Sequence, residues 1–192
     1  MNLEKLAHLF DKMGRFTLQP SQVMHMCIDP QRNFTQTEEE NLAIENVTEK
    51  IIPSLRIMGI KTIWVYFANM GINGKPNELD KSYGGFHPLV KPDLNDVVIP
   101  KTHVSAFKES NIRGMFKQSD IKLLLVSGVA FEACVADTVV GAKYTGRTVV
   151  LLKDGTDYQT DDNFTLNHIQ QSGACITSFD DLLPYLSNKN FG

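Results

Sequence analysis

Three side chains of complementary chemistry follow predicted strands of this sequence. Asp29 comes directly after the first predicted strand, Lys101 after the third, and Cys134 shortly after the fourth, at the start of a helix. Ligands of open α/β sheets bind in the crevice outside the carboxyl ends of the strands. A carboxylate, an amine and a thiol are therefore expected to meet at one edge of the sheet.

The chemistry expected of this trio is acyl transfer through the thiol. A thiol near a helix N-terminus and beside an ammonium group is expected to have a lowered pKa and a larger thiolate fraction. A carboxylate within hydrogen-bond reach can accept the thiol proton during attack and pass it to a leaving amine. The loop 128–130 can direct backbone N–H groups at a developing oxyanion. The pattern predicts a cysteine-dependent site without a histidine base.

The elements that must position these residues alternate between strands and helices. Apolar runs predict strands at residues 23–28, 62–67, 97–99, 121–126, 148–152 and 175–177. Thr37, with Glu40 three positions later, is expected to start a helix, and Asp161 is expected to cap a later one. The alternation predicts a Rossmann-like, doubly wound α/β domain, with a mostly parallel sheet of about six strands and helices on both faces.

The whole chain, residues 1–192, is predicted to form a single domain, because no repeat or linker divides it. An amphipathic helix is expected at about residues 2–14. A long excursion rich in Gly, Pro, Asn and Asp covers residues 69–96. Loops of this length in compact domains are usually functional or mobile, so the excursion is expected to take part in substrate selection.

Composition excludes several classes of protein. Apolar residues make up 42% and charged residues 21%, which is typical of a folded domain and not of a disordered chain. No run is long enough for a membrane helix, and a net charge of -3 without a basic cluster argues against nucleic-acid binding. The three cysteines form neither a CxxC pair nor a zinc pattern. Without a secretory signal, a cytoplasmic location with reduced thiols is expected.

Three segments resemble the signature regions of the isochorismatase-like cysteine hydrolases. They are residues 27–34 (CIDPQRNF), residues 99–107 (IPKTHVSAF) and residues 126–138 (VSGVAFEACVADT). Residues 141–150 and Asp154 extend the resemblance, which runs in order from about residue 23 to residue 173.

The resemblance implies a role for each member of the trio. Asp29 corresponds to the general base, Lys101 to the polarising amine and Cys134 to the nucleophile that forms a thioester. It also implies a cis peptide bond between Val129 and Ala130. The backbone N–H groups of Ala130 and Cys134 are then the expected oxyanion hole.

Substrate contacts are expected from Phe34, Phe107, Val129 and Phe131, together with the excursion 69–96. Phe34 matches a position that often lines the pocket in this family. A small-molecule substrate is therefore expected.

No metal or organic cofactor is expected. The metal-binding nicotinamidases of the family carry an Asp-x-His motif after the second strand, whereas this chain has FANMGIN at residues 67–73. His87 is the one histidine of the excursion, and a single histidine there is more often a loop residue than a ligand. Glu132, two residues before the nucleophile, is either a specificity determinant or a solvent-facing residue.

The resemblance implies an amidase-type hydrolase, acting on a non-peptide C–N bond of a small amide, carbamoyl or ureido substrate. Two alternatives stay open: a vinyl-ether hydrolase acting on an isochorismate-type compound, and a catalytically silent binding or regulatory member. Family members commonly assemble, so a homo-oligomer, a dimer or a tetramer, is expected. His25, Cys27 and Cys175 lie in predicted strands and are expected to be packed core residues.

Overall fold

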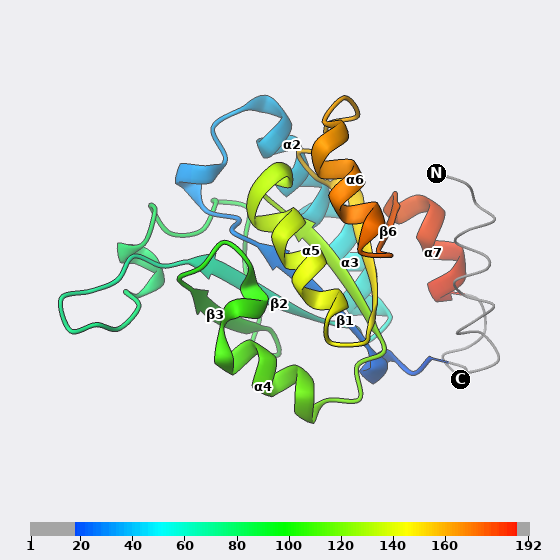
Figure 1. Ribbon diagram of the computed structural model, residues 1–192, viewed down its shortest axis with the longest axis horizontal. Coiled ribbons are helices and arrows are strands. Elements are labelled where there is room, and N and C mark those ends of the chain that lie inside the picture. Colours follow the sequence, from blue (N-terminus) through cyan, green and yellow to red (C-terminus); the bar gives the residue numbers. More distant parts are fainter. Residues whose placement is uncertain (1–17, 188–192) are drawn as a thin grey trace.

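A computed structural model of the protein describes residues 18–187. Within that range, six parallel strands form one sheet in the order β3-β2-β1-β4-β5-β6. The strands are β1 (Val23–Ile28), β2 (Lys61–Phe67), β3 (Val97–Lys101), β4 (Leu123–Gly128), β5 (Thr148–Thr156) and β6 (Cys175–Thr177). This order confirms the predicted doubly wound α/β fold (Figure 1). The helix predicted at residues 2–14 lies outside the described residues.

Helices cover both faces of the sheet, and each face has its own hydrophobic cluster. One face is covered by α2 (Glu38–Asn46), the π-helical segment Val47–Ile51, α3 (Ile52–Ile57) and α7 (Phe179–Ser187). The other face is covered by α4 (Ser110–Gln118), α5 (Ala136–Lys143) and α6 (Asn163–Gln171). The sheet therefore lies between two layers of helices, as the alternation of strands and helices predicts.

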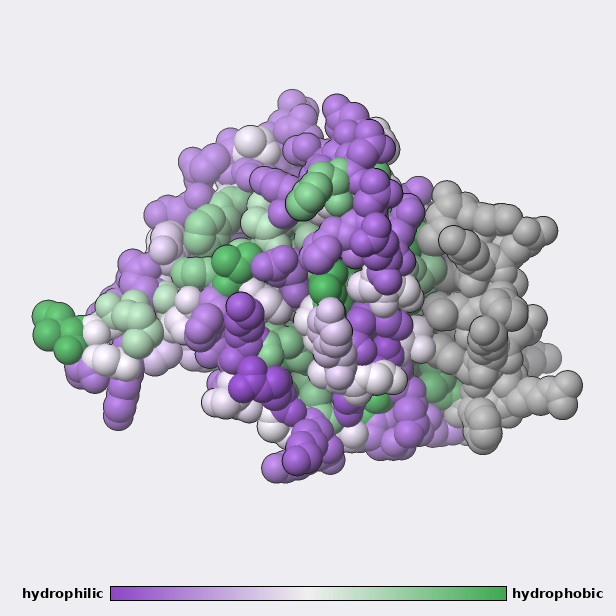
Figure 2. Space-filling model, in the orientation of Figure 1, coloured by the Kyte–Doolittle hydropathy of each residue, from purple (hydrophilic) through white to green (hydrophobic). Residues whose placement is uncertain are grey.

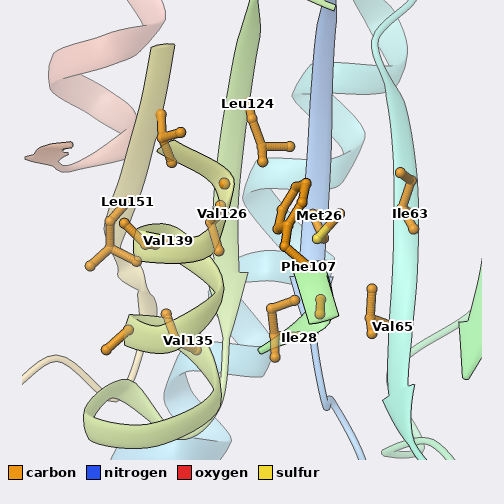
Figure 3. Packing of buried hydrophobic residues seen from close by; sticks show 14 of the residues in the cluster. Met26, Ile28, Ile63, Val65, Phe107, Leu124, Val126, Val135, Val139 and Leu151 are labelled. Atoms are coloured by element: carbon orange, nitrogen blue, oxygen red, sulfur yellow. The ribbon is translucent and has the colours of Figure 1, made fainter. Parts of the chain in front are cut away.

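The central strand β4 shows why the apolar runs form buried strands. All of its residues are buried, and Leu123 to Val126 alternate between the two clusters. Figure 3 shows Leu124 and Val126 on the same side of the sheet as Val135 and Val139, which come from the helical stretch after β4. A strand buried on both faces favours consecutive apolar residues, and residues 123–126 supply them. The strand begins two residues later than predicted, because Lys122 is exposed.

Local capping signals decide where two of the helices begin. Thr37 and Glu40 form the predicted capping box, in which each side chain accepts the backbone N–H of the other residue. The cap predicted at Asp161 is wrong by one residue. Asp162 is the N-cap, and its carboxylate accepts the N–H of Thr165 at 3.0 Å. The spacing of three residues between cap and donor fits Asp162, because the helix begins at residue 163.

Two strands extend at least two residues beyond the range that the sequence indicates. β3 continues through Pro100 to Lys101, which an edge strand tolerates because proline lacks only the N–H donor. β5 continues from residue 152, where the predicted strand ends, through Gly155 to Thr156. A Cβ on Gly155 would lie 2.9 Å from the Ile51 side chain and 3.0 Å from that of Ser127. Glycine is therefore required there for close packing and does not end the strand.

The excursion 69–96 contains no strand and one short 3-10 turn, Leu79–Lys81. Part of it projects from the body of the molecule (Figure 1), and hydrophobic residues lie at its outer tip in an otherwise mostly hydrophilic surface (Figure 2). Met70 and Ile72 are exposed in this part of the chain. Among the described residues, no helix is both long and apolar enough to cross a membrane.

Candidate active site

The structure brings Asp29, Lys101 and Cys134 together at the carboxyl edge of the sheet. Asp29 directly follows β1, Lys101 is the last residue of β3, and Cys134 lies in the helical turn after β4. The Lys101 Nζ atom lies 2.7 Å from Asp29 Oδ2 and 3.2 Å from Cys134 Sγ. The ammonium group thus contacts both the carboxylate and the thiol.

The ammonium group of Lys101 is held away from water. Its side chain is fully buried, and Nζ donates to the carbonyl oxygens of His103 and Val104, each at 3.1 Å. Nζ also lies 4.2 Å from the centroid of the Phe67 ring. Carbonyl oxygens and an aromatic face replace the water that a buried cation loses. Lys101 is therefore fixed in place between the carboxylate and the thiol.

Asp29 occupies an unusual backbone position. Its φ is +49°, in the left-handed region that only a few per cent of non-glycine residues adopt. Its N–H donates to Val65 O at 2.8 Å, and its own carbonyl accepts the N–H of Gln31 at 2.7 Å. These bonds hold the turn after β1, and they direct the buried carboxylate toward Lys101.

Burial raises the pKa of the Asp29 carboxyl group to about 6, although the adjacent Lys101 ammonium acts to lower it. At neutral pH the carboxylate is therefore mostly ionised. A carboxylate with a pKa this close to neutral accepts a proton more readily than an exposed aspartate does.

The pKa of Cys134 moves in the direction opposite to the prediction. Burial and the negative charge of Asp29 raise the pKa of the thiol to about 12, and they outweigh the lowering by Lys101. The expectation of a larger thiolate fraction is wrong. Cys134 rests as a thiol, so it needs a base at the moment of attack.

The turn that carries Cys134 begins with a close approach of two strands. Gly128 has a φ of +112°, and a Cβ there would lie 2.1 Å from Ile28 O. Only glycine allows this contact, which places the end of β4 directly against the end of β1. The following N–H, that of Val129, donates to Ile28 O at 2.9 Å. The peptide bond between Val129 and Ala130 is cis, which confirms the expectation from the resemblance.

A π-helical turn, Phe131–Val135, then presents the nucleophile. The carbonyl oxygen of Ala130 accepts the N–H of Val135 at 3.1 Å and that of Ala133 at 3.2 Å. A regular α-helix would use the N–H of Cys134 at this carbonyl. The N–H groups of Ala130 and Cys134, predicted to form the oxyanion hole, thus belong to the first turn of a helix, where donors lack regular intrahelical partners.

Three of the four residues predicted to contact substrate have buried side chains. Phe107, Val129 and Phe131 are buried in the hydrophobic clusters, and Figure 3 shows Phe107 beside Met26 over the strands. The Phe107 ring packs on Phe116 with ring centroids 5.1 Å apart. A fully packed side chain offers no surface to a substrate, so the prediction is corrected for these three.

Phe34 is half-buried and belongs to an aromatic cluster that the sequence reasoning missed. Its ring centroid lies 4.7 Å from that of Tyr83 and 6.3 Å from that of Phe67. Phe67 is also the ring beneath Lys101 Nζ, so the aromatic cluster of Phe34, Phe67 and Tyr83 adjoins the trio. Phe67 ends β2 at the same edge, and the strand-end rule applied to aromatic residues would have found it.

Gln31 fixes the excursion to the sheet. Its side chain is fully buried and makes three hydrogen bonds, donating to Phe67 O and Ser82 O and accepting the N–H of Phe67. Ser82 precedes Tyr83, which has a φ of +49°. The Gln31 amide therefore ties the aromatic cluster to the turn that carries Asp29.

His87 and Glu132, the two residues of open role, lie outside the trio's contacts. The His87 ring hydrogen-bonds to Asn41 at 3.1 Å, and burial and the nearby Arg32 lower its pKa. Glu132 is exposed. Among residues 18–187, no group of three or more histidine, cysteine or acidic side chains is arranged to hold a metal ion.

Comparison with known proteins gives a family match over most of the chain. Residues 23–181 match the model of the isochorismatase domain. The chain is 24% identical over 181 residues to the uncharacterized isochorismatase family protein YrdC of Bacillus subtilis (strain 168), a match that covers 81% of this chain and 91% of the relative.

A shorter match links the chain to an enzyme of named activity. It is 33% identical over 67 residues to the ureidoacrylate amidohydrolase RutB of Variovorax paradoxus (strain S110), which covers 35% of this chain and 27% of that protein. Among solved structures, an isochorismatase family protein from Burkholderia thailandensis superposes with a TM-score of 0.74 at 20% identity, covering 89% of this chain and 98% of the other. That likeness confirms the fold.

Proposed function

Because this chain belongs to the isochorismatase family of hydrolases, we propose that it hydrolyses a small amide, carbamoyl or ureido substrate through a thioester on Cys134. The observation that carries the proposal is the contact of Lys101 Nζ with both Asp29 Oδ2 and Cys134 Sγ inside a buried cluster. The local similarity to a ureidoacrylate amidohydrolase supports a C–N bond as the target.

The first step is attack by Cys134 on the substrate carbonyl carbon. The raised pKa of the thiol keeps it protonated at rest, and the ionised Asp29 carboxylate accepts that proton as the new S–C bond forms. The carbonyl electron pair moves onto oxygen. The N–H groups of Ala130 and Cys134 stabilise this oxyanion, and a donor of this kind is typically worth about 10²- to 10³-fold in rate.

The second step releases the amine. The C–N bond breaks, and Asp29 returns the proton to the leaving nitrogen, so that ammonia or an amine departs and a thioester remains. Lys101 transfers no proton in this scheme. Its positive charge stabilises the Asp29 carboxylate, whose burial would otherwise favour the neutral acid.

The third step regenerates the enzyme. Water attacks the thioester carbonyl while Asp29 again accepts a proton, the C–S bond breaks, and the thiol recovers its proton as the acid leaves. The aromatic cluster of Phe34, Phe67 and Tyr83 adjoins Lys101, and we propose that it contacts the apolar part of the substrate.

Acylation of Cys134 can be tested before the natural substrate is known. The protein is treated with p-nitrophenyl acetate and with a panel of amides, carbamates and ureido acids, and peptide mapping by mass spectrometry locates any adduct. We expect an acetyl group on Cys134 in the wild type and none in Cys134→Ala. Wild-type protein without an adduct and without turnover of any C–N compound would overturn the proposal.

The same variant separates the two alternative functions. A vinyl-ether hydrolase that does not use the thiol would keep its turnover of an isochorismate-type compound in Cys134→Ala. A silent binding member would bind a metabolite, detected by a thermal shift, without acylation of Cys134.

We further propose a cytoplasmic homo-oligomer. The mechanism requires a reduced thiol, which a reducing compartment maintains. Light scattering coupled to size-exclusion chromatography measures the assembly, and a monomer at micromolar concentration would contradict this part of the proposal.

A further inference from the structure

A buried carboxylate outside the trio contacts the turn that carries the nucleophile. Asp157 lies directly after β5 and is 7% exposed. Its Oδ1 atom accepts the backbone N–H of Phe131 at 2.8 Å and the hydroxyl of Thr156 at 3.1 Å. The mechanism described above gives Asp157 no role, and the cost of burying a carboxylate calls for an explanation.

Asp157 caps the nucleophile turn from a different part of the chain. The residue at the usual N-cap position of this turn is Ala130, whose side chain makes no capping hydrogen bond. Asp157 supplies the missing acceptor to the first N–H of the turn, and a negative charge there is also favoured by the helix dipole. The neighbouring Tyr158 packs on the Phe131 ring, with centroids 5.1 Å apart. The end of β5 therefore holds Phe131 through both its backbone and its side chain.

The position of Phe131 determines the geometry of the expected oxyanion donors. Phe131 directly follows Ala130, and Cys134 lies three residues later in the same π-helical turn. If Phe131 moved, the N–H groups of Ala130 and Cys134, which lie on either side of it in the chain, would shift relative to one another. The Sγ atom of Cys134 has a separate anchor, since Lys101 Nζ lies 3.2 Å from it.

We propose that Asp157 is a positioning residue that aligns the N–H groups of Ala130 and Cys134 for the oxyanion of acyl transfer. This inference rests on the proposed function. It predicts that loss of Asp157 impairs reactions that form an oxyanion and spares reactions of the thiol that form none.

Two reagents that attack the same sulfur test this separation. Acetylation by p-nitrophenyl acetate forms the S–C bond, breaks the ester C–O bond and passes through an oxyanion, with the thiol proton going to Asp29. Alkylation by iodoacetamide displaces iodide at a saturated carbon and forms no oxyanion. Both rates are measured at Cys134 by peptide mapping, with Cys134→Ala as the background.

We expect Asp157→Ala to lower the acetylation rate by about 10- to 100-fold, the range that a misplaced reacting group typically costs. The alkylation rate should stay within about twofold of wild type, because the contacts of Sγ are unchanged. Asp157→Asn keeps an oxygen acceptor for the Phe131 N–H, so its acetylation rate should recover to within about fivefold of wild type.

Glu132→Gln is the matched control. Glu132 is exposed. Burial is the main cause of the raised pKa of the Asp157 carboxyl group, and the charge of Glu132 adds to it. Its substitution removes one negative charge beside the same turn but leaves the capping hydrogen bond in place. Both rates should match wild type within about twofold if the bond and not the charge matters.

Three results would overturn the inference: normal acetylation in Asp157→Ala, an equal fall of both rates, or an equal loss of acetylation in Glu132→Gln. If Asp157→Ala does not fold, Asp157→Glu replaces it, because a carboxylate displaced by one methylene should also impair acetylation selectively. A wild-type protein that is not acetylated at all would instead overturn the proposed function, so the two failures are distinguishable.

Discussion

Two buried polar clusters contain residues four positions apart in the chain, His25 within β1 and Asp29 directly after it, and the clusters differ in charge. In the first, the His25 ring hydrogen-bonds to Thr62 at 3.2 Å and to Ser127 at 2.8 Å, and burial lowers the pKa of His25 to about 3. In the second, Asp29 and Lys101 form a fully buried ion pair beside Cys134. Both clusters are almost inaccessible to water.

The comparison shows that burial of polar groups does not by itself mark a reactive site. The His25 cluster is neutral, and its hydroxyl and imidazole groups satisfy one another across three strands, so it is expected to stabilise the sheet. The Asp29 cluster keeps full charges in a dry environment and places its carboxylate on a left-handed backbone. Buried charge commonly costs stability, and here it provides a base with a pKa near neutral.

The largest difference between the clusters should appear on removal of the proposed base. Asp29→Asn keeps the shape of the side chain, and asparagine tolerates the left-handed backbone. We expect acetylation of Cys134 to fall about 10³-fold, within the range for loss of a general base. His25→Gln should change that rate less than about threefold. Comparable losses in both variants would mean that the His25 cluster also supports the chemistry.

Removal of the cation tests how the ion pair affects folding. Lys101→Met leaves the Asp29 carboxylate buried without its partner, which should lower the free energy of unfolding by about 3–5 kcal/mol. Thr62→Val, which removes one neutral hydrogen bond from the other cluster, should cost about 1 kcal/mol. Urea denaturation measures both. Equal losses would show that the charge of the Asp29 cluster carries no special cost.

The pH dependence of acetylation tests the state of the charged cluster. Below the Asp29 pKa of about 6 the carboxylate is protonated and cannot accept the thiol proton, so the rate should rise about tenfold per pH unit and then level off. Because burial raises the pKa of Cys134 to about 12, free thiolate should add little near neutral pH. A rate that keeps rising steeply above about pH 8 would show that the reaction uses preformed thiolate instead.

The smallest expected effect is the influence of His25, in the neutral cluster, on the pH dependence of the free energy of unfolding. In the native state the pKa of His25 is lowered to about 3, so when the pH falls below about 6.5 only the unfolded chain binds the proton. The contribution of His25 to the free energy of unfolding should therefore fall as the pH drops from about 6.5 toward 3, whereas the raised pKa of Asp29 contributes with the opposite sign. His25→Gln should be less stable by about 1–2 kcal/mol at neutral pH. Its stability should also lack the His25 contribution to the pH dependence, and an unaltered slope would argue against a neutral His25.

The meeting of Asp29, Lys101 and Cys134 was predictable because all strands of this sheet are parallel, so residues that follow different strands lie at the same edge. Asp29, Lys101 and Cys134 each follow a strand that the apolar pattern identifies, and parallel strands bring their carboxyl ends to one edge. Predicting the packed His25 needed only its place within a buried strand. These conclusions depend on local sequence, and the structure agrees with the placement.

The environment of the trio was not predictable from local sequence. The ammonium and the helix N-terminus, which lower a thiol pKa, can be read from the chain, but burial and the contact with Asp29 depend on packing. Phe131 looked like a pocket residue, whereas Asp157, 26 positions later, fixes its backbone. Tyr83 gave no signal, because an irregular loop carries no periodic pattern that places its residues.

The place of Lys101 in the sheet has a consequence for dynamics. It ends β3, an edge strand that pairs with β2 alone and whose residues Val97 and Val98 are 40% and 41% exposed. Edge elements with few buried contacts open locally at a lower free energy than central strands do. Detachment of β3 would withdraw the cation while β1 and β4 remain paired. Amide hydrogen exchange should therefore be faster in β3 than in β4, and heating should abolish acylation before the core unfolds.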